Sequence, residues 1–171
     1  MIHLNIGSNI DSKYGNRFDN ISTSINLLIN SKIKIEKISN FYETPSYPNN
    51  KFPSYLNIGL LVNYNFDSYT LLKEAKLIEK KIGRIDSKRN NPRVCDIDII
   101  DFKGFEINSD EITLPHPRCN LRNFVLYPIE EIDPNWIHPA LKKNVKFLIN
   151  NLDQKSKIEI TRLSKNVNIS T

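Results

Sequence analysis

A short run of β-branched residues that carries two aspartates restricts the folds open to this chain. Residues 94–100 read Val-Cys-Asp-Ile-Asp-Ile-Ile, which predicts a strand. Strand side chains alternate between faces, so we expect Asp96 and Asp98 on one face and Cys95 and Ile97 on the other, with the aspartate Cα atoms about 6.6 Å apart. Such a pair can hold hard cations beside a polyphosphate, which predicts a phosphoryl-transfer site. The alternative is a solvated sheet face or an edge protected by charge.

Arginine is concentrated around this strand. Lysine outnumbers arginine 17 to 7 in the chain, yet five of the seven arginines lie between residues 84 and 122. These five are Arg84, Arg89, Arg93, Arg118 and Arg122. Arginine makes planar, bidentate contacts to phosphate that lysine cannot make. The clustering therefore indicates an anion site beside the aspartate pair.

The remaining patterns predict an α+β fold. Apolar alternation and helical spacing indicate, in order, a strand at 2–6, a helix from about 16 to 30, strands at 33–41 and 55–64, a helix at 67–83 and the aspartate strand. This order predicts a ferredoxin-like βαββαβ core, in which helices cover an antiparallel sheet to give one αβα sandwich domain over residues 1–171.

The helix boundaries and the C-terminal part of the chain carry their own signals. Asp67 is the expected N-cap of the second helix, and Gly83 is expected just after its end. A last helix is predicted from about 140 to 152, and we expect the polar tail after Gln154 to be partly frayed.

A proline-rich loop and an aromatic–amide pair suggest a binding surface. Residues 44–53 contain three prolines and no periodicity, so we expect a loop of the kind that forms binding lids. On the strand that follows, Tyr55 and Asn57 share one face, where they could stack on and pair with a flat heterocycle; the alternative is a solvated sheet surface. Glu79 borders the buried stripe of the second helix near the basic loop, and we expect it to be an ordinary solvated charge, with a ligand role as the alternative.

Two polar segments flank the aspartate strand. Residues 84–93 form a basic loop, a candidate phosphate clamp. Residues 113–118 read Thr-Leu-Pro-His-Pro-Arg and contain His116. This histidine is a candidate general acid or hydrogen-bond donor to phosphate, and the alternative is a structural or exposed histidine. Arg122 and Phe124 follow within eight residues of His116.

Composition narrows the cellular setting. Cys95 and Cys119 are the only cysteines and form no zinc-binding pattern, the N-terminus lacks an apolar signal segment, and no apolar stretch is long enough to span a membrane. The net charge of +5 comes from scattered lysines and is weak evidence for nucleic acid. We expect a cytoplasmic monomer that binds small molecules and neither nucleic acid nor membranes.

Six short motifs occur in an order that resembles a known family. They are Gly7-Ser8-Asn9, Phe41-Tyr42-Glu43-Thr44-Pro45, Tyr55-Leu56-Asn57, Gly83-Arg84, residues 92–99 (Pro-Arg-Val-Cys-Asp-Ile-Asp-Ile) and Leu114-Pro115-His116-Pro117-Arg118. Together they are similar to the 6-hydroxymethyl-7,8-dihydropterin pyrophosphokinase family of the folate pathway. The resemblance runs from residue 2 to about residue 152 and leaves 153–171 as a C-terminal tail.

The resemblance implies transfer of the pyrophosphoryl group of ATP to the pterin hydroxymethyl oxygen, with release of AMP. It implies two Mg²⁺ ions at Asp96 and Asp98, and catalytic roles for these two residues with Arg84 and Arg93. The implied pterin contacts are Thr44, Pro45, Tyr47, Tyr55, Asn57, Asp96 and Phe124. The implied ATP contacts are Arg84, Lys88, Arg93, Ile99, Thr113, His116 and Arg122. The competing interpretations are a basic ferredoxin-like RNA-binding module and a Mg²⁺-dependent phosphodiester hydrolase.

Overall fold

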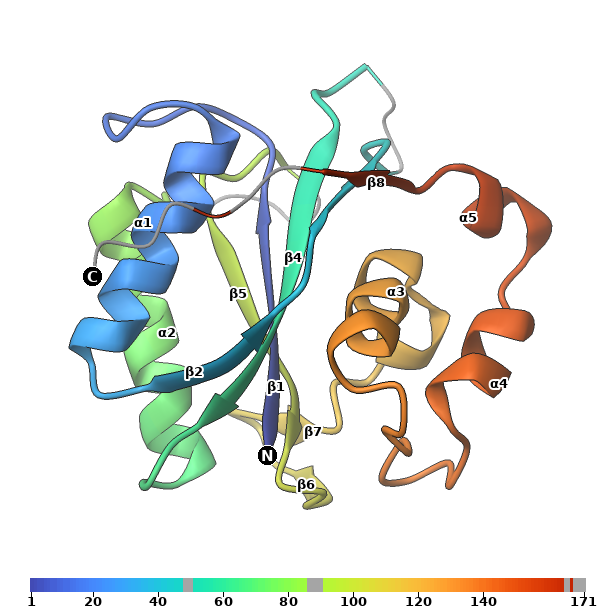
Figure 1. The fold of residues 1–171 in the computed structure, drawn as a ribbon. Helices are drawn as coiled ribbons and strands as arrows, with labels where there is room; N and C mark the ends of the chain where they lie inside the picture. Colours follow the sequence, from blue (N-terminus) through green and yellow to red (C-terminus); the bar gives the residue numbers. More distant parts are fainter. Residues whose placement is uncertain (48–50, 86–90, 165–166, 168–171) are drawn as a thin grey trace.

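The computed structural model describes residues 1–47, 51–85, 91–164 and 167 (Figure 1). The elements in chain order are β1 (Ile2–Ser8), α1 (Arg17–Asn30), β2 (Lys34–Ile38), β3 (Phe41–Thr44), β4 (Tyr55–Asn63), α2 (Ser68–Ile82), β5 (Asp96–Phe102), β6 (Ile107–Asn108), β7 (Thr113–Leu114), the 3₁₀ helix η1 (Cys119–Leu121), α3 (Asn123–Ile132), α4 (Val145–Asn150), α5 (Gln154–Ile158) and β8 (Thr161–Leu163). No helix in the described part of the chain has the length and apolar character needed to cross a bilayer.

The main sheet has the strand order β5-β1-β4-β3-β8, and β2 also pairs with β4. All of these pairings are antiparallel, while β6 and β7 form a separate two-stranded sheet. With β2 and β3 counted as one predicted strand, β5-β1-β4-β3 is the strand order of a ferredoxin-like fold. The predicted fold class is therefore confirmed, with β8 added at one edge.

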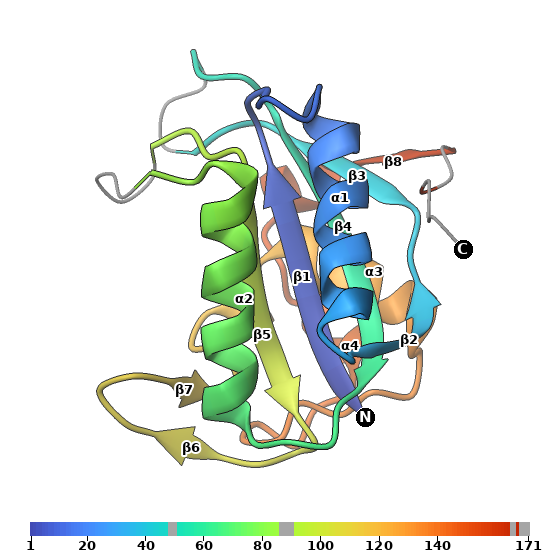
Figure 2. The same cartoon turned by 90° about the vertical axis from the view of Figure 1, so that its left-hand side faces the viewer.

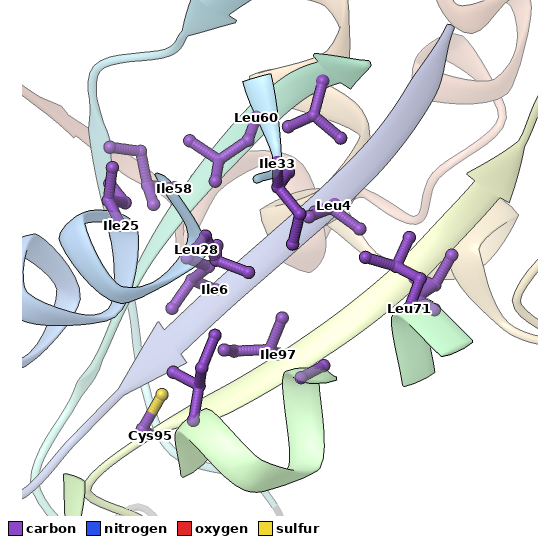
Figure 3. Close-up of a cluster of buried hydrophobic side chains, with 14 of the residues drawn as sticks. Leu4, Ile6, Ile25, Leu28, Ile33, Ile58, Leu60, Leu71, Cys95 and Ile97 are labelled. Atoms are coloured by element: carbon purple, nitrogen blue, oxygen red, sulfur yellow. The ribbon is translucent and has the colours of Figure 1, made fainter. Parts of the chain in front are cut away.

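Helices cover both faces of this sheet. Figure 1 shows α1 and α2 on one face and α3 and α4 on the other, and Figure 2 shows α1 and α2 lying side by side along β1 and β5. The larger hydrophobic core lies beneath α1 and α2, where Ile6 of β1 and Ile97 of β5 meet Leu28 of α1 (Figure 3). A second core around Leu126 and Trp136 packs α3 and α4.

The ends of both long helices follow local hydrogen bonding. Asn16 and Asp19 form a reciprocal capping box at the start of α1. The carboxylate of Asp67 accepts a hydrogen bond from the Thr70 N–H at the start of α2, and Gly83 ends that helix with φ +111°. Both predicted boundaries of α2 are confirmed.

The predicted strand 33–41 is wrong as a single element. It is divided at residues 39–40 into β2 and β3, which pair with successive parts of β4. The break is stabilised by Ser39, whose hydroxyl accepts a hydrogen bond from the Gly59 N–H at 2.9 Å and whose N–H donates to the Gly59 carbonyl at 3.0 Å. Ser39 alone therefore satisfies both the N–H and the carbonyl of Gly59 where the predicted strand is interrupted.

The C-terminal predictions also need correction. The last helix is shorter than 140–152, because Lys142 adopts φ +54° and the Asn144 side chain caps α4 by accepting from the Phe147 N–H. Residues 154–163 of the tail form α5 and β8, and β8 pairs with β3 at the edge of the sheet, while 165–166 and 168–171 lie outside the described residues. β8 is ordered by pairing with the edge of β3, a partner that the polar sequence of the tail does not reveal.

Gly59 allows α3 to lie close to the sheet. A Cβ at this position of β4 would lie 2.6 Å from Cβ of Pro128 and 3.5 Å from Cδ1 of Ile132, both in α3. The first distance is far below van der Waals contact, so helix and strand approach closely only because residue 59 has no side chain. This approach sets the position of the N-terminal end of α3, where Phe124 lies.

We predict that Gly59→Ala destabilises the protein. Alanine in a strand interior usually raises the free energy of unfolding by about 0.5–1 kcal/mol relative to glycine. Here, overpacking against Pro128 should instead lower the free energy of unfolding by about 1–3 kcal/mol. Urea denaturation measures the difference. Asn63→Ala at the exposed end of β4 serves as the control and should change stability by less than about 0.5 kcal/mol. A Gly59→Ala variant as stable as the parent would contradict the close approach.

Candidate active site

The two aspartates of β5 face a cavity of about 570 Å³ between the sheet and α3. Asp96 and Asp98 line it, whereas Cys95 and Ile97 are buried in the larger core on the opposite side of the strand. The predicted alternation is confirmed. Gly7 of β1 pairs with Asp96 on one side and with Asn57 of β4 on the other, so it lies on the cavity floor between the two groups.

Two guanidinium groups hold Asp96. Arg84 Nη1 lies 2.6 Å from its Oδ1, and Arg93 Nη1 lies 2.5 Å from its Oδ2. Burial favours the neutral acid, but the two arginines outweigh burial and hold the Asp96 pKa below its usual range. Asp96 is therefore an ionised carboxylate whose charge is balanced by arginine.

Asp98 is less well compensated. Burial and the neighbouring Asp96 charge raise the pKa of Asp98 to about 6. The nearest basic groups are more distant: Arg122 Nη1 lies 3.5 Å and His116 Nε2 lies 3.9 Å from Asp98 Oδ2. Additional positive charge would relieve the repulsion between the two carboxylates.

His116 is poorly suited to be a general acid. Burial, followed by the charges of Arg122 and Arg118, lowers the His116 pKa to about 4. The ring is therefore neutral near pH 7. It can still donate one hydrogen bond to a phosphate oxygen.

Glu79 is a site residue that the sequence interpretation missed. Its side chain is 2% exposed, not solvated, because α2 packs against β5 and carries Glu79 to that strand. Its Oε1 accepts from the Ile97 N–H at 2.7 Å, and its Oε2 lies 2.6 Å from Arg84 Nη1. The useful signal was its position between the buried Ile78 and Ile82 of α2. Glu79 and Asp96 therefore hold Arg84 between them.

Asn9 orients the backbone of Arg93. The Asn9 side-chain oxygen accepts from the Arg93 N–H at 2.7 Å, and the Asn9 N–H donates to the Arg93 carbonyl at 3.0 Å. Its amide nitrogen also donates to the Pro53 carbonyl at 3.2 Å. The turn after β1 thus links the arginine to the proline-rich loop.

The other part of the cavity is aromatic and has an unsatisfied amide. Tyr55 and Asn57 of β4 and Phe124 of α3 line it. Asn57 is 3% exposed, and its Nδ2 has no hydrogen-bond partner in the described residues. Buried donors without a partner are rare, so this amide marks a position where a ligand atom could accept a hydrogen bond. A flat, polar ring suits these walls.

The cavity collects most of the residues singled out from the sequence. Its lining includes Thr44, Pro45, Tyr47, Tyr55, Asn57, Arg93, Asp96, Asp98, Arg122 and Phe124. Arg84 adjoins it through Asp96. Gly7, from the first motif, and Arg118, from the arginine cluster, also line it, whereas the sequence interpretation did not anticipate the lining residues Asn5, Leu121, Asn123, Ser156 and Glu159.

The other predicted residues do not line this cavity, although His116 adjoins it through Asp98. Thr113 and His116 line a second hollow of about 530 Å³ beside β6 and β7. The Ile99 side chain is 6% exposed and packs in the larger core. Lys88, in the middle of the candidate phosphate clamp, is outside the described residues.

The acidic groups suit a cation that is shared with a ligand. Within residues 1–47, 51–85, 91–164 and 167, no three His, Cys, Asp or Glu side chains gather in a metal-binding cluster. Asp96 and Asp98 alone supply two carboxylates on one strand face. Mg²⁺ is commonly bound by one or two carboxylates together with substrate phosphates and water, so the donor set fits Mg²⁺ brought in with a polyphosphate.

Curated proteins of similar sequence have folate-related names. The chain is 38% identical over 141 residues to the "Folic acid synthesis protein FOL1" of Dictyostelium discoideum, a match that covers 82% of this chain but only 21% of that protein. It is 34% identical over 145 residues to the 2-amino-4-hydroxy-6-hydroxymethyldihydropteridine pyrophosphokinase of Aquifex aeolicus, covering 85% of this chain and 88% of that protein.

Solved structures share the fold. The chain superimposes on the wild-type HPPK-DHPS of Plasmodium falciparum with a TM-score of 0.70 and 15% sequence identity, over 94% of this chain and 47% of that chain. The model of the 7,8-dihydro-6-hydroxymethylpterin-pyrophosphokinase (HPPK) family matches residues 3–134, which include β5, both aspartates and most of the cavity lining. From this match and the extent of the Aquifex similarity, the chain belongs to the 7,8-dihydro-6-hydroxymethylpterin-pyrophosphokinase family.

Proposed function

We propose that the protein transfers the pyrophosphoryl group of ATP to the hydroxymethyl oxygen of 6-hydroxymethyl-7,8-dihydropterin, yielding the pterin diphosphate and AMP. One observation supports this proposal above all. A single cavity combines an aspartate pair and arginines with aromatic walls and an unsatisfied buried amide. Phosphoryl-type transfer relies on positioning and charge neutralisation, and this cavity can provide both for a ring and a polyphosphate together.

The pterin occupies the aromatic part of the cavity in this proposal. Tyr55 and Phe124 hold its two faces, while the Asn57 amide pairs with an acceptor on its edge. Thr44, Pro45 and Tyr47 line the same region, and the 82% exposed Tyr47 lies at its rim. These contacts direct the hydroxymethyl group toward Asp96.

The triphosphate lies against the basic groups. Arg84, Arg93 and Arg122 offer guanidinium donors, and neutral His116 offers an N–H. The second hollow, lined by Thr113 and His116, is where we place the nucleoside. Arg84 and Arg93 now neutralise Asp96, so phosphate can draw these arginines away from the carboxylate when it binds.

Asp96 and Asp98 would hold Mg²⁺, with two ions expected. Bound there, Mg²⁺ supplies positive charge to the phosphate oxygens during transfer. The hydroxymethyl oxygen forms a bond to the β-phosphorus of ATP, the bond from that phosphorus to the bridging oxygen of AMP breaks, and the hydroxyl proton is lost to water. Arg93 stabilises charge on the departing AMP oxygen. No general base is needed, and the low pKa of Asp96 makes it a weak one.

The competing interpretations are not favoured. An RNA-binding sheet exposes its aromatic residues on an open face, whereas Tyr55 lies in a cavity beside two carboxylates that repel phosphate unless a cation is present. Simple hydrolysis of a phosphodiester leaves the aromatic walls and the unsatisfied Asn57 amide without a role.

Nucleotide chromatography tests the reaction itself. Protein mixed with Mg²⁺, ATP and 6-hydroxymethyl-7,8-dihydropterin should produce AMP and the pterin diphosphate in equal amounts. Formation of ADP, or of phosphate without pterin, would contradict the proposal, and the second result would indicate hydrolysis.

We predict that Asp98→Asn impairs pyrophosphoryl transfer without destabilising the fold. Transfer should fall by orders of magnitude, because a charged metal ligand is lost. Stability without metal should be equal or higher at pH 7, because the folded-state pKa of Asp98 is raised from 3.8 to about 6 and its ionised form is disfavoured by folding. In the parent protein, the raised pKa of Asp98 stabilises the folded state below about pH 4, and this stabilisation is lost as the pH rises through about 6.

Thermal unfolding with and without Mg²⁺-ATP, together with AMP production, measures these effects of Asp98→Asn. The control is Asp110→Asn, at an exposed position between β6 and β7, which should retain both activity and ligand stabilisation. AMP production near the parental rate in Asp98→Asn would remove Asp98 from the metal site.

We predict that Tyr55→Ala weakens pterin binding selectively. Loss of one stacking face should cost about 1–3 kcal/mol, by analogy with the stacking of nucleic-acid bases on aromatic residues, while ATP affinity should not change. Titration calorimetry with 6-hydroxymethylpterin, and separately with Mg²⁺-ATP, measures both. Tyr14→Ala, at an exposed tyrosine before α1, is the matched control. Unchanged pterin affinity in Tyr55→Ala would exclude the ring sandwich.

A further inference from the structure

The C-terminal strap, residues 153–163, lies outside the family match to residues 3–134 yet is firmly attached to the fold. The Asp153 side chain caps α5, and β8 pairs with β3 in the register Phe41↔Leu163 to Glu43↔Thr161. Figure 1 shows the strap running from beside α4 to the edge of the sheet. It is therefore a structured part of the molecule.

The strap joins α3 and β3, two of the elements that carry proposed ring-binding residues. At one end, the Asn123 side chain donates a hydrogen bond to the Ser156 carbonyl at 2.6 Å, directly before Phe124 in α3. At the other end, β8 lies beside β3, which finishes at Thr44. The Nη2 atom of Arg162 in β8 also lies 3.4 Å from Oε1 of Glu131 in α3. The strap thus bridges α3 and β3 across the mouth of the cavity.

Two residues of the strap, Ser156 and Glu159, line the same cavity as Asp96 and Asn57. Glu159 caps the C-terminal end of α5, two residues before β8, which lies at the edge of the sheet opposite β5. Four strand spacings separate β8 from β5, a distance of about 19 Å. The Glu159 carboxylate therefore cannot share a cation with Asp96 and Asp98, and it makes the cavity acidic on the side away from the phosphate-binding arginines.

The partner of Glu159 in the structure is weakly held. Its Oε1 lies 3.7 Å from Lys155 Nζ in an exposed i, i+4 pair, and such pairs contribute little. The carboxylate is therefore available to a ligand. The amino-pyrimidinone edge of a pterin presents neighbouring N–H groups, from the 2-amino group and the ring N3, that a carboxylate can accept.

We propose that Glu159 is a specificity residue that accepts hydrogen bonds from the 2-amino side of the pterin, which makes the C-terminal strap part of the substrate site. This inference rests on the proposed function, because it takes the ring to be a pterin oriented with its hydroxymethyl group toward Asp96. In this arrangement the hydrogen-bond donors of the substrate meet a carboxylate at one side of the cavity, and its phosphate acceptor meets arginines at the other.

The test measures binding of 6-hydroxymethylpterin by its fluorescence. Glu159→Ala should raise the dissociation constant about tenfold, as expected for loss of a partly exposed charged hydrogen bond, with ATP affinity and melting temperature unchanged. Glu159→Gln, which keeps one acceptor oxygen, should fall between the parent and Glu159→Ala. Glu111→Gln, an exposed carboxylate between β6 and β7, is the control and should bind like the parent.

A pterin analogue that lacks the 2-amino group separates recognition from a structural role. The parent should bind the analogue about tenfold more weakly than the pterin, and Glu159→Ala should lose most of that preference. If Glu159→Ala weakens both compounds equally or keeps the full preference, Glu159 does not read the amino group, and the inference fails while the proposed function stands. If the parent binds neither compound, both fail.

Discussion

Two like charges on one face of β5 are the constraint around which the site is built. Asp96 and Asp98 line the wall of a cavity, where burial and then the neighbouring Asp96 charge raise the pKa of Asp98 to about 6. Arg84 and Arg93 neutralise Asp96 directly, while Arg122 is farther from Asp98. The cavity is thus electrostatically suited to a cation and a polyanion, which would redistribute these pairings.

The arginines can serve this purpose because other parts of the fold hold them in place. Glu79 is buried between α2 and β5 and contacts Arg84 as well as the backbone of β5. Asn9, in the turn after β1, fixes the backbone of Arg93 through two hydrogen bonds. Neither residue lines the cavity. Both act through the arginines, which reduces the freedom the guanidinium groups would lose on binding phosphate.

The opposite wall depends on how closely α3 approaches the sheet. Gly59 leaves room for Pro128, so the helix lies low over β4 and carries Phe124 to the same cavity as Tyr55. The C-terminal strap then links α3 to β3 through Ser156 and β8. Residues far apart in the chain thereby line one continuous cavity, with arginines near β5 and the Glu159 carboxylate between α5 and β8.

The sequence by itself determined the order of the βαββαβ core, the shared face of Asp96 and Asp98, and the boundaries of α2, because alternation, helical spacing and capping are local properties of the chain. It also pointed to most cavity residues through short motifs. Only the tertiary structure decided that Glu79 is buried, that one predicted strand bends at Ser39, and that the polar tail completes the sheet. Those outcomes depend on partners more than a turn or strand away, since burial and edge pairing arise from packing between elements and leave no periodic signal in the segment itself.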